Sequence, residues 1–478
     1  FGFFMSGIVG IASKKDCAED LFYCTDYHSH LGTKYGGLAV FNGKVIEREI
    51  HNISENQFRP QFSNWIRDLK GKTGIGVISD YEPQPLIIDS HLGTFSIVHV
   101  GAVQNLEQLV EEAHRRRSAH FTEMGGSKVN PTELIATLIN QGDNFVDGIE
   151  IMQNKIKGSS SVMLLNGDGI YVARDKYGRT PLVIGKRGNA RAVVSESCAL
   201  PNTGFEIERY LGPGEIGIVT ADGYEQLKKP GEEMQICSFL WIYYGYPASD
   251  YEGINVEAAR YRCGAIHGQK DLEENLEVDF VAGIPDSGTA HAIGYANVTG
   301  FPYKRPFVKY SPTWQRSFMP QEQKTREMIG KMKLILNEEI VNGKRIVFCE
   351  DSIVRGTQLQ GTIQRLFDAG AKEVYMRPAC PPLTYACKFL NFSRSKSEFD
   401  LAARKAVRDL LGREDFDMAP YLEEGSKEYE EMVNQIRKNL GLTGLRYQKL
   451  CDMVKAIGLP REKLCTYCWT GQDITLSK

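Results

Sequence analysis

Short apolar runs alternate with amphipathic segments along much of the chain. Residues 346–349 form an apolar run rich in β-branched and aromatic side chains, which is typical of a strand buried on both faces. A polar loop at residues 350–357 follows, and the apolar positions after it fall on one face of a helix that ends at Gly370. The pattern predicts a buried parallel strand, a small polar loop and a helix, in that order.

Further elements of the same kind surround this one. Residues 278–285 and 307–309 are apolar runs that we expect to be strands, and strands alternating with helices predict a doubly wound parallel sheet. Ligands bind such sheets at the carboxyl ends of the strands. Residues 6–11 predict another strand, and residues 421–441 predict a charged amphipathic helix. We expect its apolar stripe to be packing surface, and it consists of Tyr429, Met432, Val433, Ile436 and Leu440.

Length, charge and cysteine content narrow the classes of function. With 478 residues the chain is too long for one hydrophobic core, which indicates two or three domains. A net charge of -3 gives no support for a nucleic-acid or membrane partner, and no apolar run is long enough to span a bilayer. Residues 1–4 are apolar but lack the basic lead of a secretion signal, so we expect a buried first strand. The 11 scattered cysteines favour reduced thiols with some metal ligation over a disulfide scaffold, and hence a cytoplasmic protein.

The polar loop has the parts of a phosphate-binding site. Backbone N–H groups at the start of a helix lack partners and lie at the positive end of the helix dipole. Gly356, the hydroxyls of Ser352 and Thr357, and the charge of Arg355 can surround a phosphate there. The two acids at residues 350–351 suit sugar hydroxyls or Mg²⁺. The loop therefore predicts a sugar-phosphate site, with an ordinary strand-to-helix turn as the alternative.

The loop residues EDSIVRGT resemble the VDDSIVRGTT loop that binds phosphoribosyl pyrophosphate (PRPP) in type I phosphoribosyltransferases. The chain as a whole resembles the amidophosphoribosyltransferase family. The resemblance implies Mg²⁺ bound by Ser287, Glu350 and Asp351. It implies PRPP binding by nine residues: Lys309, Glu350, Asp351, Ser352, Ile353, Val354, Arg355, Gly356 and Thr357.

The same resemblance implies the fold and its division. Residues 1–235 should form an Ntn-hydrolase-like αββα sandwich, similar to class II glutamine amidotransferases. Residues 236–412 should form the doubly wound parallel sheet of a type I phosphoribosyltransferase, and residues 413–478 a helical tail.

A polar stretch at residues 310–332 resembles the flexible loop that closes over PRPP in this family. The resemblance implies that Arg316 faces the pyrophosphate and that Lys331 and Lys333 add positive charge beside it. A loop that is simply solvated is the alternative.

The glutamine-hydrolysing site of the family is altered in this sequence. Ser6 stands where the family has an N-terminal cysteine nucleophile whose own amine serves as base, and five residues precede it. Ser79 replaces an arginine that binds the glutamine carboxylate, Val100 an oxyanion donor, and Pro131 an aspartate that holds the amine. We expect an inactive glutaminase on an intact fold, with a divergent site in another register as the alternative.

Two more departures lie in the second part of the chain. Glu350 replaces the first aspartate of the family's PRPP loop. Tyr246 and Ala248 replace an arginine and an aspartate of the family motif IYFxRPDS, so the nitrogen-acceptor end of the site differs.

Four cysteines match the positions that bind a cluster in one branch of the family. Cys237, Cys387, Cys465 and Cys468 are the matching residues, so the resemblance implies a 4Fe-4S cluster that holds distant parts of the chain together. Four thiolates also suit tetrahedral zinc, which stays open as the alternative.

The resemblance, with which these features agree, implies an enzyme of purine nucleotide synthesis. It should transfer nitrogen to C1 of PRPP and yield 5-phosphoribosylamine and pyrophosphate. With the glutaminase inactive, ammonia should come from solution or from a partner protein. We also expect a homo-oligomer, a dimer or tetramer. The alternatives are a PRPP-binding regulator without catalysis and a transferase that uses another amine.

Overall fold

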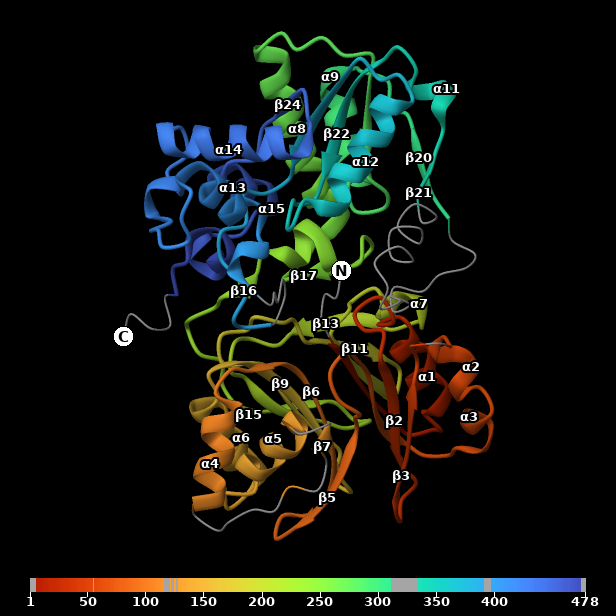
Figure 1. The fold of residues 1–478 in the computed structure, drawn as a ribbon. Coiled ribbons are helices and arrows are strands. Elements are labelled where there is room, and N and C mark those ends of the chain that lie inside the picture. Colours follow the sequence, from red (N-terminus) through yellow and green to blue (C-terminus); the bar gives the residue numbers. More distant parts are fainter. Residues whose placement is uncertain are drawn as a thin grey trace.

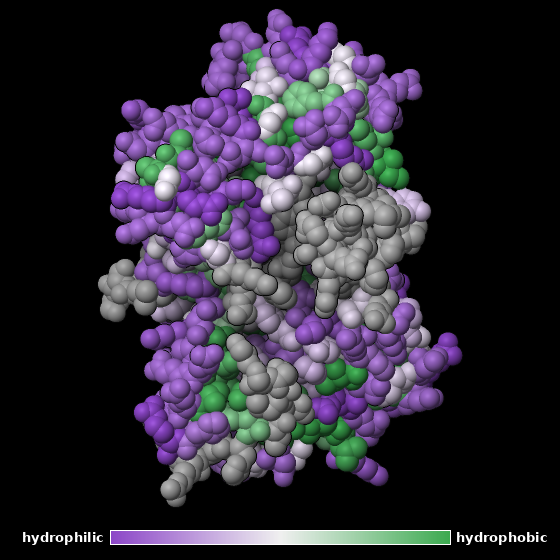
Figure 2. Space-filling model, in the orientation of Figure 1, coloured by the Kyte–Doolittle hydropathy of each residue, from purple (hydrophilic) through white to green (hydrophobic). Residues whose placement is uncertain are grey.

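The computed structural model describes residues 6–54, 56–115, 121, 124–125, 128–310, 334–390 and 397–473. The two halves of the chain form two stacked parts, red to yellow below and green to blue above in Figure 1. Most of the coloured surface in Figure 2 is hydrophilic. Within the described residues, none of the helices combines the length and the apolar character needed to cross a membrane.

Two antiparallel sheets make up the centre of the N-terminal half. The seven-stranded sheet has the order β13 (Glu206–Tyr210), β11 (Val183–Arg187), β12 (Ala190–Val194), β1 (Ser6–Ser13), β4 (Thr73–Ser79), β2 (Tyr35–Phe41) and β3 (Ile46–Asn52). The six-stranded sheet has the order β15 (Tyr224–Lys228), β14 (Ile216–Val219), β10 (Ile170–Ala173), β9 (Gly158–Leu165), β6 (Gly93–Val103) and β5 (Leu86–Ser90). Their inner faces share one apolar core, in which Ile8 of β1 and Val98 of β6 are fully buried.

Helices cover the outer face of each sheet. The outer face of the seven-stranded sheet packs against α1 (Ala18–Asp26), α2 (Phe58–Phe62), α3 (Trp65–Asp68) and α7 (Ala199–Asn202). The outer face of the six-stranded sheet packs against α4 (Leu106–Arg115), α5 (Pro131–Ile139) and α6 (Phe145–Lys155). The four layers confirm the predicted αββα sandwich (Figure 1).

A parallel sheet forms the centre of the C-terminal half. Its order is β19 (Phe280–Gly283), β22 (Arg345–Glu350), β23 (Glu373–Pro378) and β24 (Gly444–Leu445). One face packs against α9 (Thr289–Thr299), which lies on α8 (Val256–Glu273). The other face packs against α12 (Thr357–Asp368), α13 (Ala402–Leu411) and α14 (Lys427–Leu440). This arrangement confirms the predicted doubly wound fold.

The remaining elements are short. β7 (Met124–Gly125) pairs with β8 (Lys128–Val129), β17 (Asp250–Tyr251) with β18 (Ile254–Asn255), and β16 (Ile236–Cys237) with β25 (Leu464–Cys465). The others are the π-helix η1 (Leu240–Tyr244), α11 (Glu338–Val341), α15 (Leu450–Ile457), α16 (Tyr467–Thr470) and the 3-10 turns η2 (Glu398–Asp400), η3 (Ala419–Tyr421) and η4 (Arg461–Lys463).

The prediction that residues 307–309 belong to the parallel sheet is wrong. β20 (Phe307–Lys309) pairs antiparallel with β21 (Leu334–Leu336) in a separate ribbon. The chain touches the sheet slightly earlier, where Lys304 N donates to Val281 O, and then leaves it. Phe307 is buried while Val308 and Lys309 are exposed, so this strand lacks the two-sided burial of a strand inside a parallel sheet.

The predicted helix at residues 421–441 is shorter than expected. α14 begins at Lys427, where the hydroxyl of Ser426 accepts a hydrogen bond from Tyr429 N at 3.1 Å, and it ends at Gly441 with φ of 73°. Its apolar stripe lies in the core of the C-terminal half, as predicted. The predicted strands at residues 6–11 and 346–349 and the helix ending at Gly370 are confirmed.

The structure leaves several predictions untested. The expected strand at residues 1–4 and nearly all of the expected loop at residues 310–332 lie outside the described residues. The three-part division at residues 235 and 412 stays a prediction. We note that β24, in the predicted tail, is a strand of the parallel sheet.

Close packing of α8 on α9 generates a test of stability. A Cβ atom on Gly264 would collide with the backbone carbonyl oxygen of His291. We expect Gly264→Ala to lower the free energy of unfolding by about 1–3 kcal/mol, because helix backbones cannot shift freely in a packed core. Gly361→Ala on α12 is the control, since its Cβ would enter open space, and it should raise stability by up to about 1 kcal/mol. Urea denaturation followed by circular dichroism would measure both, and equal effects of the two variants would contradict the packing argument.

Candidate functional site

The predicted sugar-phosphate loop joins the carboxyl end of β22 to the start of α12. Glu350 and Asp351 are buried there, with exposed fractions of 7% and 5%. Gly356 precedes the helix with φ of 77°, in the left-handed region that favours glycine. A Cβ at Gly356 would also lie 3.1 Å from a side-chain carbon of Leu440 on α14. We call residues 350–357 the cradle.

Hydrogen bonds hold the two carboxylates of the cradle. Glu350 Oε1 accepts from Ser287 Oγ at 3.1 Å and from Asp351 N at 3.0 Å, and Ser352 Oγ donates to Asp351 Oδ1 at 2.5 Å. Burial, followed by the neighbouring Asp351, raises the pKa of Glu350 well above its ordinary value. Two adjacent buried acids attract a cation or hydroxyl donors.

The apolar residues of the cradle anchor it in the core. The side chains of Ile353 and Val354 are buried in two different apolar clusters, so only their backbone can face a ligand. Val354 O accepts from Ala402 N at 2.7 Å, and Ala379 N donates to Glu350 O at 2.9 Å. The loop is therefore held from both sides before any ligand binds.

The structure brings several predicted residues to the same edge of the sheet. Ser287 follows β19, and Lys309, at the end of β20, pairs with the neighbouring Asp286 through Nζ and Oδ2 at 2.6 Å. Arg316, Lys331 and Lys333 lie outside the described residues.

Ser287, Glu350 and Asp351 are the residues that could hold Mg²⁺. Across the described ranges, no group of three or more His, Cys, Asp or Glu side chains could by itself hold a metal ion. Mg²⁺ is commonly bound through one or two carboxylates together with substrate phosphates. The carboxylate pair and the Ser287 hydroxyl fit that mode of binding.

All four predicted cluster cysteines come together where the two halves meet. Cys237 of β16 lies directly opposite Cys465 of β25 in a parallel pair. A hydrogen bond from Cys468 lowers the pKa of the Cys387 thiol to about 6, and the pKa of Cys468 is raised well above its ordinary value by the same bond. Arg179 Nη1 donates to Cys465 Sγ at 3.3 Å.

The donor set fits a soft metal, although the thiols as placed do not form a metal-holding group among the residues described here. Leu390 N also donates to Cys387 Sγ, at 3.4 Å. N–H donors aimed at sulfur and the lowered pKa of Cys387 favour the thiolate form that metals bind, whereas burial raises the pKa values of Cys237 and Cys465. The chemistry suits an iron–sulfur cluster or zinc.

The residues of the altered glutaminase site have structural roles. Ser6 lies opposite Ser79 between β1 and β4, and their hydroxyls are 3.3 Å apart. Val100 is buried in the core between the two sheets, and Pro131 begins α5. Asn130 Oδ1 caps that helix by accepting from Thr132 N at 2.8 Å.

A buried polar network lies at this end of the sandwich. Glu82 Oε1 accepts from Thr132 Oγ1 and from Gln84 Nε2, each at 3.1 Å. His99 Nδ1 is 3.0 Å from Thr132 Oγ1, and His99 N donates to Gln84 Oε1 at 2.7 Å. Burial raises the pKa of Glu82 to about 7 and lowers the pKa of His99 to about 3.

Comparison with known proteins assigns the family. Residues 73–202 match the family described as a glutamine amidotransferase domain. Amidophosphoribosyltransferase of Bacillus subtilis (strain 168) is 31% identical over 483 residues, which cover 98% of this chain and 93% of the relative. The chain belongs to the amidophosphoribosyltransferase family. A further amidophosphoribosyltransferase, from Methanothermobacter thermautotrophicus, is 29% identical over 97% of this chain and 93% of the relative.

Solved structures in the amidophosphoribosyltransferase family share the fold over the whole chain. Glutamine PRPP amidotransferase from B. subtilis complexed with ADP and GMP superposes with a TM-score of 0.82 at 28% identity and covers 98% of this chain and 97% of its own. A structure described as the allosteric regulatory enzyme of purine biosynthesis has a TM-score of 0.81 at 28% identity and covers 98% of this chain and 96% of its own. The resemblance found in the sequence is confirmed.

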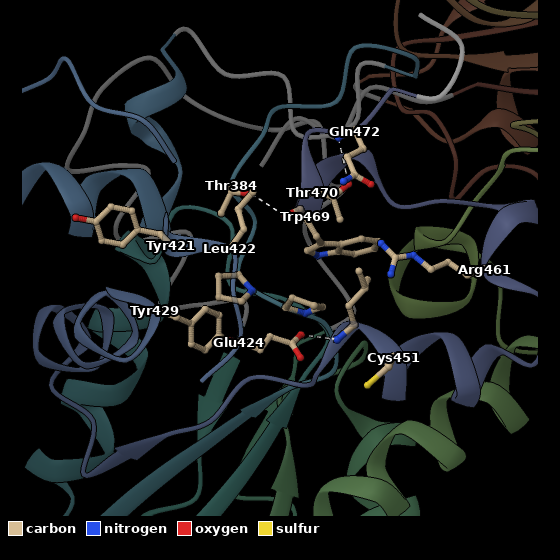
Figure 3. A pocket seen from close by; sticks show the side chains of 13 residues that line it. Thr384, Tyr421, Leu422, Glu424, Tyr429, Cys451, Arg461, Trp469, Thr470 and Gln472 are labelled. Atoms are coloured by element: carbon tan, nitrogen blue, oxygen red, sulfur yellow. Dashed lines mark hydrogen bonds between the residues drawn. The ribbon is translucent and has the colours of Figure 1, made fainter. Parts of the chain in front are cut away.

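A cavity of about 370 Å³ lies apart from the cradle (Figure 3). Figure 3 shows Trp469 and Arg461 next to each other on one side and Tyr421 and Tyr429 on the opposite side. Glu424 Oε1 accepts from Leu450 N, a backbone N–H group that lines the cavity, at 2.7 Å. The wall of the cavity comes from four separate segments of the chain, which explains why no sequence pattern indicated the cavity. The lining residues are Pro381, Pro382, Thr384, Tyr421, Leu422, Glu424, Tyr429, Leu450, Cys451, Arg461, Trp469, Thr470 and Gln472.

Sequence reasoning missed two buried charged residues, one in each half of the chain. Glu196 lies between two serines after β12, and Arg260 lies on α8. Both are almost fully buried, with exposed fractions of 1% and 3%. No periodicity marks either residue, because their partners come from other segments.

The raised pKa of Glu82 predicts that the stability of the protein depends on pH. The folded protein keeps the proton of Glu82 up to about pH 7, whereas the unfolded chain loses it near 4.5. Below pH 4.5 Glu82 is protonated in both states and does not lower the free energy of unfolding. As pH rises from 4.5 to 7, only the unfolded chain releases the proton, so the folded state becomes progressively less stable. We expect the free energy of unfolding of Glu82→Gln, relative to that of wild type, to rise by about 3 kcal/mol between pH 4.5 and pH 7. Above pH 7 the difference should rise no further.

Chemical denaturation from pH 4.5 to 8 would measure this difference. The control is Glu225→Gln, since Glu225 on β15 is exposed and lies outside the buried network, so this variant should show no gain of that size. A constant difference for Glu82→Gln would show that Glu82 has no raised pKa in the folded state.

Proposed function

We propose that the protein transfers the nitrogen of ammonia to C1 of PRPP and yields 5-phosphoribosylamine and pyrophosphate for purine nucleotide synthesis. The observation that carries the proposal is the cradle, in which two buried carboxylates end β22 and a small polar loop enters α12. Sugar hydroxyls donate to carboxylates, and phosphate accepts from N–H groups at a helix start. Membership of a family of enzymes named for this transfer supports the proposal and disfavours a regulator without catalysis.

The reaction exchanges one bond at C1. The nitrogen lone pair forms a bond to C1 while the C1–O bond to pyrophosphate breaks, and that electron pair leaves with pyrophosphate. One proton is then released from the nitrogen. The site contributes by orientation and charge, because no protein group needs to form a covalent bond.

Each part of the cradle has a proposed task. Glu350 and Asp351 accept hydrogen bonds from the ribose hydroxyls, and residues 352–357 hold the 5-phosphate. Mg²⁺ bound by Glu350, Asp351 and Ser287 would add positive charge at the pyrophosphate.

Basic residues are proposed to balance the negative charge of the pyrophosphate. We propose that Arg316, Lys331 and Lys333 balance the charge of the departing group, together with Lys309. Its position supports this part, because Lys309 Nζ lies 2.6 Å from Oδ2 of Asp286, the residue before Ser287.

We propose that ammonia comes from solution or from a partner protein. A serine hydroxyl at position 6 is a weaker nucleophile than a thiolate, and Val100 is buried without a donor for an oxyanion. We also propose a homo-oligomer and a division into residues 1–235, 236–412 and 413–478.

We further propose that Cys237, Cys387, Cys465 and Cys468 hold a 4Fe-4S cluster, with zinc as the alternative. Their convergence from three separate parts of the chain supports a structural role for the metal. The N–H donors directed at two of the sulfurs support it as well.

Release of pyrophosphate tests the proposed reaction. The protein, kept anaerobic, would be incubated with PRPP and Mg²⁺ and with ammonium chloride, glutamine or neither. We expect release with ammonium chloride alone. Release with glutamine would contradict the inactive glutaminase, and no release with any addition would contradict the transfer.

A variant of the cradle links that activity to the site. Asp351→Asn should lower kcat/KM for PRPP by about 10²-fold or more, because it removes a charge from the reacting centre. Asp368→Asn is the matched control, since Asp368 is exposed at the far end of α12, and it should leave kcat/KM unchanged.

The cysteine proposal has its own test. Cys237→Ser should lose bound metal and lower the thermal transition temperature, because one ligand and the bond it makes are removed. Cys451→Ser is the control, since Cys451 is exposed and should have no effect on metal content. Iron, sulfide and zinc content of the anaerobically purified proteins would be measured. Equal metal content in the two variants would exclude Cys237 as a ligand.

A further inference from the structure

Arg179 reaches from the N-terminal half into the four-cysteine set. It lies in the loop between β10 and β11 and is almost fully buried, with an exposed fraction of 2%. Its Nη1 donates to Cys465 Sγ at 3.3 Å, and its Cζ lies 3.4 Å from the centre of the Phe389 ring. Because Phe389 follows Cys387 by two residues, this one side chain contacts the segments that carry two of the cysteines.

The backbone of Arg179 contacts the segment of a third cysteine. Cys237 N donates to Arg179 O at 3.1 Å, and Gln235 N donates to Tyr177 O at 2.7 Å. The two bonds lie two residues apart on each segment, so the segments run side by side where the chain passes from one half to the other. A residue of the N-terminal half thus binds three of the segments that bring the cysteines together.

The guanidinium of Arg179 has an N–H group left for a further acceptor. Its Nε is buried and has no hydrogen-bond partner among the residues that the structure describes. A buried donor without an acceptor is costly and rare in folded proteins. Sulfur atoms of a metal centre accept hydrogen bonds of this kind, which are one of the means by which a protein tunes such a centre. The position of Nε therefore suits an acceptor supplied by a bound centre.

Charge gives a second reason for an arginine at this place. Four thiolates outweigh the charge of the zinc ion or cluster that they bind, and a buried net charge is costly without an opposite charge nearby. Asp175 Oδ1 accepts from the backbone N–H of Arg179 at 2.7 Å, which leaves the guanidinium to the sulfur and the ring. Lys388, beside Cys387, is paired with Asp473 through Nζ and Oδ2 at 2.8 Å. Arginine suits the buried position, because its charge persists on burial and its plane stacks on an aromatic ring.

We propose that Arg179 is a positioning residue for the four-cysteine centre. It holds the sulfur of Cys465 by a hydrogen bond, and its charge offsets the negative charge that the centre carries with metal bound. The inference rests on the proposed function, because metal binding by the four cysteines is part of it. Its consequence is that the N-terminal half, which supplies none of the four cysteines, contributes to how firmly the metal is held.

Two substitutions separate the charge from the hydrogen bond. Arg179→Lys keeps the charge but not the flat stacking group, whereas Arg179→Gln keeps an N–H donor and loses the charge. We expect the rate of metal release to excess chelator to rise about threefold in Arg179→Lys and about tenfold or more in Arg179→Gln. Loss of an outer contact of this kind typically weakens metal binding by about 10–100-fold.

The reduction potential of an iron–sulfur centre is a readout that a purely structural role would not move. Loss of a positive charge disfavours the added electron. For Arg179→Gln we expect the reduction equilibrium to shift about tenfold toward the oxidised form, which is a potential about 59 mV lower for one electron. For Arg179→Lys the equilibrium should stay within about twofold of wild type. With zinc in the centre, the release rates decide.

Arg187 on β11 provides the matched control. It is also an arginine of the N-terminal half that stacks on a phenylalanine, since its Cζ lies 4.4 Å from the centre of the Phe205 ring. Its ion pair is with Asp20 rather than with a sulfur. Arg187→Lys and Arg187→Gln should leave metal release and the reduction potential unchanged.

Both measurements would use the full-length protein, purified anaerobically and loaded with iron and sulfide or with zinc. Wild-type release from Arg179→Gln would overturn the inference, and so would equal acceleration in Arg179→Gln and Arg179→Lys, or in the Arg187 variants. Wild-type protein that retains no metal after either loading would instead contradict the proposed cysteine centre itself. If Arg179→Gln does not fold, Arg179→Lys decides the matter, because release at the wild-type rate from that variant would overturn the inference.

Discussion

Burial of two adjacent carboxylates at the end of β22 is the constraint on which the C-terminal half depends. Removing charges from water is costly unless hydrogen bonds or opposite charges replace the water. Around Glu350 and Asp351 the replacements come from Ser287, from Ser352 and from backbone N–H groups. The parallel pairing of β22 with its neighbours and the anchoring of the loop by Ala379 keep this pair in place.

In the N-terminal half, a set of buried polar side chains is satisfied by hydrogen bonds among its own members. Glu82, Gln84, His99 and Thr132 bind one another, so the network is satisfied within the sandwich. A network of this kind resists opening, because each member that loses its partner would remain buried and unpaired. One end of the half that resembles a glutaminase thus holds a buried network of mutual hydrogen bonds beside the apolar core.

The sequence predicted the strand, loop and helix of the cradle because an apolar run, small polar residues and a helical repeat follow one another directly. It failed at residues 307–309, since a three-residue run indicates a strand but not its partner. It placed the start of α14 too early, because the helix was predicted from Tyr421 although the first residue of its apolar stripe is Tyr429. The burial of Arg260 could not be predicted, since an arginine on a helix is typical of a surface and its carbonyl partners belong to the π-helix η1, which no repeat marks, and to Gly245 after it.

The parallel pairing of β16 with β25 has a consequence for the order of events during synthesis. Cys237 meets Cys465 only after the strands of the parallel sheet, from β19 to β24, have been made. Domains begin to fold as the chain leaves the ribosome, and earlier parts fold first. The four-cysteine set is therefore completed late, after both halves can already have formed their cores. Loading of this centre would be a maturation step that acts on an almost finished protein, and it would distinguish complete chains from chains that end before residue 464.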